Sequence, residues 1–183
     1  MLPILSGAVR GMQILHEMNS VHGDIKADNI LVNYNIHVEG QVVSVKLGDF
    51  GLARFLMDGL KTPNGNRYLG FAPDDDLTVK YDIFSFGGVL FVALVFMQTG
   101  VMVTTVTLKL QKNKVLEVNS VSLLHWLTRY LADQDRYYIE LVVQCLQLNP
   151  DDRPSSQVIA SILDRDADFV TAKRSVDLFS AQS

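Results

Sequence analysis

Two acidic side chains, an amide and a lysine lie close together in the first third of the 183-residue sequence. Asp24, Lys26 and Asn29 fall within one short segment, and Asp49 follows twenty residues after Asn29. Carboxylate and amide oxygens are the ligands that Mg²⁺ prefers. A nearby lysine can neutralise a phosphate as a point charge. These residue types therefore indicate a magnesium and phosphate site, provided that the fold brings the two segments together.

A β-hairpin is the element that would bring them together. The segments 29–33 (NILVN) and 42–47 (VVSVKL) read as two paired strands, joined by a rather long loop at 34–41. Asn29 then stands at the start of the first strand, and Asp49 comes directly after the second. The sequence thus predicts both polar groups around one hairpin.

Helices are expected on both sides of this hairpin. Apolar residues at spacings of three and four predict a helix over 2–18. Further helices are expected in the stretch that begins at residue 83, around Leu124, around Tyr138 and, after an N-cap at Ser155, over the last apolar run. Residues 48–80 hold five of the twelve glycines and read as loop. The expected fold class is mainly α with one small hairpin.

One stretch allows two interpretations. Residues 83–108 contain no charged side chain, and about 20 apolar residues suffice to span a bilayer. A helix that is apolar on all sides can also form the centre of a globular domain. The stretch alone leaves both interpretations open.

Composition narrows the function classes. The length is that of one domain, and a net charge of −4 argues against non-specific nucleic-acid binding, which needs a basic face. The single cysteine, Cys145, excludes an intrachain disulfide and favours a reducing compartment. No basic segment precedes the apolar N-terminal residues, so a signal peptide is not expected. We therefore expect an intracellular, cytoplasmic protein.

Several motifs together resemble those of eukaryotic protein kinases. His22–Asn29 (HGDIKADN) resembles the catalytic loop, and Asp49-Phe50-Gly51 resembles the Asp-Phe-Gly motif. Three later segments follow in the order of that family. They resemble the Ala-Pro-Glu motif at 72–74, the start of the central buried helix at 82–87, and the arginine-bearing turn at 149–154.

The resemblance covers roughly residues 2–164 and implies that residues 1–164 form a protein-kinase C-terminal lobe. The lobe would be a helical bundle around a central buried helix, with residues 165–183 as a C-terminal tail. The uncharged stretch starts on that central helix, so the buried interpretation is favoured and no membrane partner is expected.

The family also implies a role for each polar residue. Asp24 would accept or orient the proton of the substrate hydroxyl, and Lys26 would contact the γ-phosphate of ATP. Asn29 and Asp49 would ligate Mg²⁺, and Leu31 would form the floor under adenine. The implied function is ATP-dependent phosphoryl transfer to a protein substrate. Lys26, two residues after Asp24, follows the serine/threonine and tyrosine-kinase-like pattern.

Other residues are expected to be structural. His22 and Phe50 would stack on each other, and Asp82 would hold the catalytic-loop backbone through its N–H groups. Arg153 would form a buried ion pair with Asp74 or one of the two aspartates that follow it. The three remaining histidines show no partner pattern and are expected at the surface or as satisfied core residues: His16, His37 and His125.

The sequence departs from the family pattern in two main ways. No Gly-rich phosphate loop precedes His22, so we expect an incomplete kinase domain whose N-terminal lobe is absent. The expected partners are a protein substrate and either an N-terminal lobe supplied upstream or a regulatory protein. Residues 1–183 alone should then bind Mg-ATP weakly and transfer no phosphoryl group at a useful rate. Gly23 stands where most of the family has arginine. Both departures leave an alternative function open, a non-catalytic kinase-like (pseudokinase) binding or scaffold module.

The activation segment shows the other departures. Asp74 replaces the family's glutamate, and Thr62 and Tyr68 carry the only hydroxyls between Asp49 and Asp74. A phosphate there would lack the arginine that normally pairs with it, so phosphorylation should gain less from charge-assisted bonding.

Overall fold

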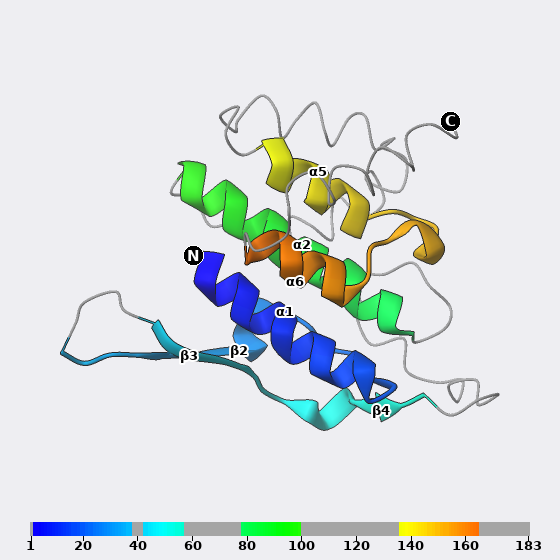
Figure 1. The fold of residues 1–183 in the computed structure, drawn as a ribbon, viewed down its shortest axis with the longest axis horizontal. Helices are drawn as coiled ribbons and strands as arrows, with labels where there is room; N and C mark the ends of the chain where they lie inside the picture. Colours follow the sequence, from blue (N-terminus) through cyan, green and yellow to red (C-terminus); the bar gives the residue numbers. More distant parts are fainter. Residues whose placement is uncertain (1, 38–41, 57–77, 100–135, 165–183) are drawn as a thin grey trace.

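The structure is a computed structural model that describes residues 2–37, 42–56, 78–99 and 136–164 (Figure 1). In this part of the chain, four α-helices pack together, and two short antiparallel strand pairs lie along one side of them. The buried apolar side chains come mainly from the helices. The predicted mainly helical fold with a small hairpin is confirmed.

Helix α1 (Leu2–Glu17) forms where the apolar spacing predicts it. Its buried face packs into the core through Leu5, Ala8, Val9 and Met12. The opposite side meets the hairpin closely, because a Cβ atom at Gly7 would come within 2.5 Å of the Val45 Cβ. Glycine at this position therefore lets the hairpin lie directly on the helix.

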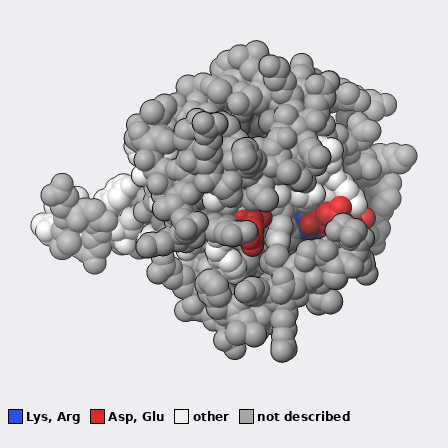
Figure 2. Space-filling view, turned by 90° about the horizontal axis from the view of Figure 1, so that it is seen from above, with Lys and Arg blue, Asp and Glu red and all other residues white. Residues whose placement is uncertain are grey.

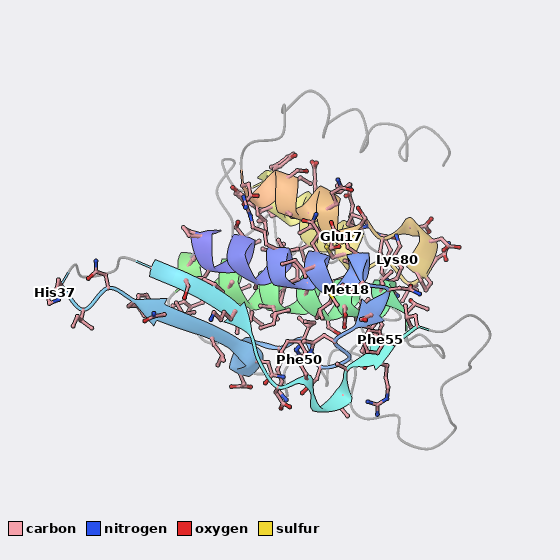
Figure 3. All side chains as sticks on the ribbon, turned by 60° about the horizontal axis from the view of Figure 1, so that its bottom comes forward. Glu17, Met18, His37, Phe50, Phe55 and Lys80 are labelled. Carbon is pink, nitrogen blue, oxygen red and sulfur yellow. The ribbon has the colours of Figure 1, made fainter. Side chains whose placement is uncertain are left out.

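The hairpin consists of β2 (Ile30–Tyr34) and β3 (Val42–Leu47), paired antiparallel with Ile30 opposite Leu47. The first strand begins one residue later than predicted, because Ala27–Asn29 form a 3₁₀ turn. The hairpin extends beyond the helices, and His37 lies near its far end (Figure 3).

Helix α2 (Val79–Thr99) confirms the predicted central helix, runs 21 residues and begins four residues before the predicted start at residue 83. Phe86, Leu90 and Leu94 on this helix are almost fully buried. Within the described residues, α2 is the one helix long and apolar enough to cross a membrane, and most of that span is buried here. Its packing supports the interpretation as a core helix.

Two shorter helices complete the described bundle. Helix α5 (Arg136–Cys145) packs against α2 so closely that a Cβ atom at Gly87 would lie 2.6 Å from the Cys145 Cβ. Helix α6 (Ser156–Leu163) packs against α1. The predicted N-cap is confirmed, since the Ser155 side chain accepts a hydrogen bond from the Val158 N–H at 3.2 Å.

One strand pair was not predicted. β1 (Ser20–Val21) pairs antiparallel with β4 (Arg54–Phe55), inside the segment expected to be loop. A 3₁₀ turn at Phe50–Leu52 precedes β4. Strands of two residues are too short to show an alternating pattern, which is why sequence reasoning missed this pair.

Some predicted features fall outside the described residues. These are the helix around Leu124, the segment 72–74, Thr62, Tyr68, His125 and the tail 165–183. Figure 2, which views the molecule from the top of Figure 1, shows two small groups of described acidic side chains, with a basic side chain beside one of them. The described part of this face carries no continuous basic patch.

Candidate active site

A buried carboxylate fixes the backbone of the segment that carries Asp24. The Asp82 side chain is fully buried, and its Oδ2 accepts a hydrogen bond from the His22 N–H at 2.7 Å. Its Oδ1 accepts from the Gly23 N–H at 2.9 Å. The predicted role of Asp82 as the anchor of the loop is confirmed.

His16 joins the same network, which sequence reasoning did not foresee. Its Nε2 lies 3.1 Å from Asp82 Oδ2, and its Nδ1 lies 3.0 Å from the Ser156 Oγ. A carboxylate only accepts hydrogen bonds, so Nε2 is the nitrogen that donates to Asp82. His16 is therefore a satisfied core residue that links α1, α2 and α6. The sequence carries no signal for this contact, because the partners lie 66 and 140 positions away.

Three of the predicted site residues lie in direct contact. The Lys26 Nζ is 2.6 Å from Asp24 Oδ2, and the Asn29 Nδ2 donates to the same oxygen at 3.1 Å. Asn29 Nδ2 also donates to the Asp24 backbone carbonyl at 2.8 Å. The hydrogen bond that Lys26 donates to Asp24 raises the pKa of Lys26, against a smaller opposing effect of burial. The negative charge of Asp49 also raises this pKa.

Asp49 follows the end of β3, at the same end of the hairpin as Asn29, as predicted. The Gly48 N–H donates to the Asn29 carbonyl at 2.8 Å, which ties the end of β3 to the start of β2. Asp49 follows in a left-handed conformation with φ of 58°, and its side chain accepts from the Gly51 N–H. The Asp49 side chain is exposed. The fold thus brings Asp24, Lys26 and Asn29 into contact and leaves Asp49 beside them, facing solvent.

Asn29 and Asp49 carry oxygen atoms of the kind that could hold a magnesium ion. Both described hydrogen bonds of the Asn29 side chain use Nδ2, which leaves the hard Oδ1 oxygen as a ligand. Asp49 adds a carboxylate. No group of three His, Cys, Asp or Glu side chains suited to a metal occurs among the described residues. A sparse oxygen set suits Mg²⁺, which keeps several waters and shares its coordination with substrate phosphates.

Leu31 offers an apolar surface next to these polar groups. Its side chain is 56% exposed and lies on β2 opposite Lys46. A Cβ atom at Gly48 would come within 2.9 Å of Leu31 Cδ1, so glycine leaves room for this side chain. Its predicted contact with adenine stays a prediction.

His22 and Phe50 form the predicted ring contact. Their ring centroids are 5.0 Å apart with planes inclined at 47°. The His22 Nε2 lies 3.0 Å from the Gly48 carbonyl oxygen, which connects the ring to the end of the hairpin. Phe50 is half exposed and lies below the helices in Figure 3.

Arg153 is buried, as expected, but its predicted acidic partners lie outside the described residues. In the described part, the guanidinium donates to the backbone carbonyls of Gln147, Lys80 and Leu148. It also lies 4.8 Å from the centre of the Phe84 ring. Arg153 thus joins the turn before α6 to the start of α2, and its ion pair with Asp74 stays a prediction.

The amino-acid sequence of this chain resembles known proteins over most of its length. The sequence profile of the protein kinase domain matches residues 3–165. The chain is 27% identical over 173 residues to the serine/threonine-protein kinase TAO2 of Rattus norvegicus, which covers 85% of this chain and 12% of that protein. It is 27% identical over 192 residues to the probable serine/threonine-protein kinase PBL15 of Arabidopsis thaliana, covering 89% and 41% respectively.

A shorter alignment of 67 residues is 43% identical to the ephrin type-B receptor 1-A of Xenopus laevis, covering 37% of this chain and 6% of the receptor. The chain therefore spans less than half the length of each of these three relatives.

Proposed function

The chain belongs to the protein kinase family, and from this premise we propose that it is the catalytic-loop-bearing part of a serine/threonine kinase. The reaction is transfer of the γ-phosphoryl group of ATP to a serine or threonine hydroxyl of a protein. The two relatives with the longer alignments carry serine/threonine kinase names, which supports this acceptor. The position of Lys26, two residues after Asp24, supports it as well.

The contact of Asp24 with Lys26 and Asn29 is the observation that carries the proposal. Both described hydrogen bonds to this carboxylate end on Oδ2. Oδ1 is then the atom left to accept the proton of a substrate hydroxyl. Asp82 holds the backbone on the N-terminal side of Asp24, so the carboxylate is positioned before substrate arrives.

Lys26 supplies positive charge where the γ-phosphate is transferred. Its pKa is raised by the hydrogen bond to Asp24, so the ammonium group stays protonated at neutral pH. The side chain is 42% exposed and can therefore reach a bound phosphate while it still contacts Asp24.

Asn29 and Asp49 would hold Mg²⁺, which neutralises phosphate charge when it is bound. Leu31 presents the apolar surface on which the adenine ring would lie. In this arrangement the metal ligands stand just before and just after the hairpin, and the adenine surface comes from its first strand. The groups that would act on the hydroxyl and the γ-phosphate come from the loop before it.

The test is phosphoryl transfer from γ-labelled ATP to a protein rich in serine and threonine, using the full-length gene product. We expect Mg²⁺-dependent transfer that is lost in Asp24→Asn. Asp28→Asn is the matched control, because Asp28 lies exposed in the same segment. Equal transfer by Asp24→Asn and the unmodified protein would refute the proposed role of Asp24.

A non-catalytic scaffold is the second candidate. It is favoured by Gly23, which holds φ of +78° at the position where most of the family has arginine. A Cβ atom there would lie 3.0 Å from the Leu52 carbonyl oxygen, so a larger side chain is disfavoured. If the full-length protein shows neither transfer nor a thermal shift with Mg-ATP, the scaffold function is correct and the kinase function is wrong.

A further inference from the structure

A continuous seam joins the loop that leads to Asp24 with the segment that follows Asp49. Five successive residues on one side each meet the other side. The contacts are Asn19 with Leu56, Ser20 with Phe55, Val21 with Arg54, His22 with Phe50, and the close approach of Gly23 to Leu52. Figure 3 shows Phe55 of this seam beneath the end of α1, where Met18 lies.

Asn19 closes the far end of the seam with two hydrogen bonds. Its side-chain Nδ2 donates to the Leu56 carbonyl at 2.6 Å, and its own carbonyl accepts from the Leu56 N–H at 2.8 Å. Asn19 adopts φ of 52° two residues after α1 ends at Glu17, and its N–H donates to the His16 carbonyl. Such a left-handed residue commonly ends a helix, and glycine serves that purpose at least as well. Ending the helix therefore does not require the amide side chain.

Asn19, at one end of the seam, and Asp49, directly before segment 50–56, share an uncommon backbone conformation. Asn19 and Asp49 are the two non-glycine residues with positive φ in the described part of the chain. A residue in a sparsely populated conformation keeps it only when contacts on both sides hold it there. Before Asp49, the Gly48–Asn29 hydrogen bond fixes the chain. After Asp49, the segment 50–56 is held by the seam, whose last contact is the Asn19–Leu56 pair.

We propose that Asn19 is a positioning residue for Asp49, because its amide fastens the far end of segment 50–56 to the catalytic loop. The proposal rests on the function proposed above, in which Asp49 is a metal ligand. Asn19 touches neither substrate nor metal. It acts by limiting the backbone freedom of the segment that begins at Asp49.

Two substitutions separate the amide donor from the turn. Asn19→Gly keeps the left-handed turn and removes the side chain. Asn19→Asp keeps the size and the turn preference, but it replaces the NH₂ donor with an oxygen that faces the Leu56 carbonyl. Asn35→Asp is the matched control, because the Asn35 Oδ1 accepts from the His37 N–H, which an aspartate can also do.

The readouts are hydrogen exchange at the Leu56 amide and the affinity for Mn²⁺, a paramagnetic substitute for Mg²⁺. Mn²⁺ binding is followed through broadening of the Asn29 and Gly51 amide signals in the NMR spectrum of the 183-residue chain. In both Asn19 variants we expect Leu56 exchange to rise about fivefold, the factor of one ordinary hydrogen bond, and Mn²⁺ to bind about threefold to fivefold more weakly. Amides in α1 and the Asn35→Asp control should match the unmodified chain.

The outcomes that overturn the proposal are distinct. If both variants exchange and bind Mn²⁺ like the unmodified chain, the side chain has no role. If exchange rises while Mn²⁺ affinity is unchanged, Asn19 is structural only. If the unmodified chain and Asp49→Asn respond identically to Mn²⁺, the proposed metal site fails and the positioning role fails with it. Leu56 exchange then still reports whether the amide closes the seam.

Discussion

The anchored side of the candidate active site and its open side are built in contrasting ways. On the anchored side, His16, His22 and Asp82 are largely buried, and their polar groups satisfy one another. On the open side, Leu31, Asp49 and Phe50 are exposed. The contrast separates two tasks. Buried hydrogen bonds set where the loop lies, and exposed side chains are left to meet a ligand.

Asp24 stands between the two sides and should give the largest effect of any single substitution. Asp24→Asn should lower phosphoryl transfer by the full-length protein by about 10²–10⁴-fold, the usual contribution of a positioned base. Its free energy of unfolding should change by less than about 1 kcal/mol, because asparagine keeps the shape and an acceptor oxygen. Labelled-ATP transfer and urea unfolding measure the two quantities. A large loss of stability would place Asp24 on the anchored side instead.

Asp82 tests the anchored side directly. Asp82→Ala leaves the His22 and Gly23 N–H groups and the His16 ring without their acceptor in a buried site. We expect a loss of about 3–5 kcal/mol in the free energy of unfolding, measured with urea. Asp152→Ala, at an exposed position before α6, is the control and should change stability by less than about 0.5 kcal/mol. If Asp82→Ala changed the free energy of unfolding as little as Asp152→Ala, the buried hydrogen bonds would not be what fixes the loop.

Adjacent glycines in α2 sharpen the comparison, because only one faces the packed interior. Gly87→Ala adds a Cβ atom that would lie 2.6 Å from the Cys145 Cβ, so we expect destabilisation of about 1–3 kcal/mol. A Cβ atom at Gly88 meets no described atom within 4 Å. Gly88→Ala should therefore stabilise the helix by up to about 1 kcal/mol. In thermal unfolding, we expect the melting temperature to fall for Gly87→Ala and to rise for Gly88→Ala.

The smallest effect is expected at the surface ion pair of Arg10 on α1 with Asp164, which follows α6. Asp164 accepts hydrogen bonds from Ser6 and from Arg10, whose Nε and Nη2 lie 3.0 and 2.6 Å from Asp164 Oδ2. Although burial acts to raise it, these bonds hold the pKa of Asp164 below its ordinary value of 3.8. Because Arg10 is exposed, Arg10→Ala should cost only about 0.2–1 kcal/mol at neutral pH.

The pH dependence of the Arg10–Asp164 ion pair follows from the lowered pKa of Asp164. A carboxylate whose pKa is lowered by folding stabilises the protein above about pH 4 and loses this contribution as the pH falls through the lower folded value. The unfolding free energies of Arg10→Ala and the unmodified chain should therefore converge at a pH below the lowered pKa of Asp164. A gap that stays constant down to that pH would show that Arg10 acts through packing and not through Asp164.

Part of the fold could be predicted from the sequence because the patterns that indicate helices and strands are local. Apolar spacing located α1, α5 and α6, and the stretch without charged residues located α2. The two apolar runs located the hairpin that brings Asn29 near Asp49. The partners of His16 could not be predicted, because a contact between distant helices leaves no mark in the spacing of either. The carbonyl partners of Arg153 and the two-residue strands of the seam leave no composition signal for the same reason.

The close contact of α2 with α5 has a practical consequence through the chain's single thiol. Burial raises the pKa of Cys145 to about 12, so almost no thiolate exists in the folded protein at neutral pH. Since the thiolate is the nucleophile, an alkylating reagent reacts only after α5 moves away from α2. The rate of labelling at Cys145 therefore counts openings of this helix pair, and the native chain carries its own reporter of that motion.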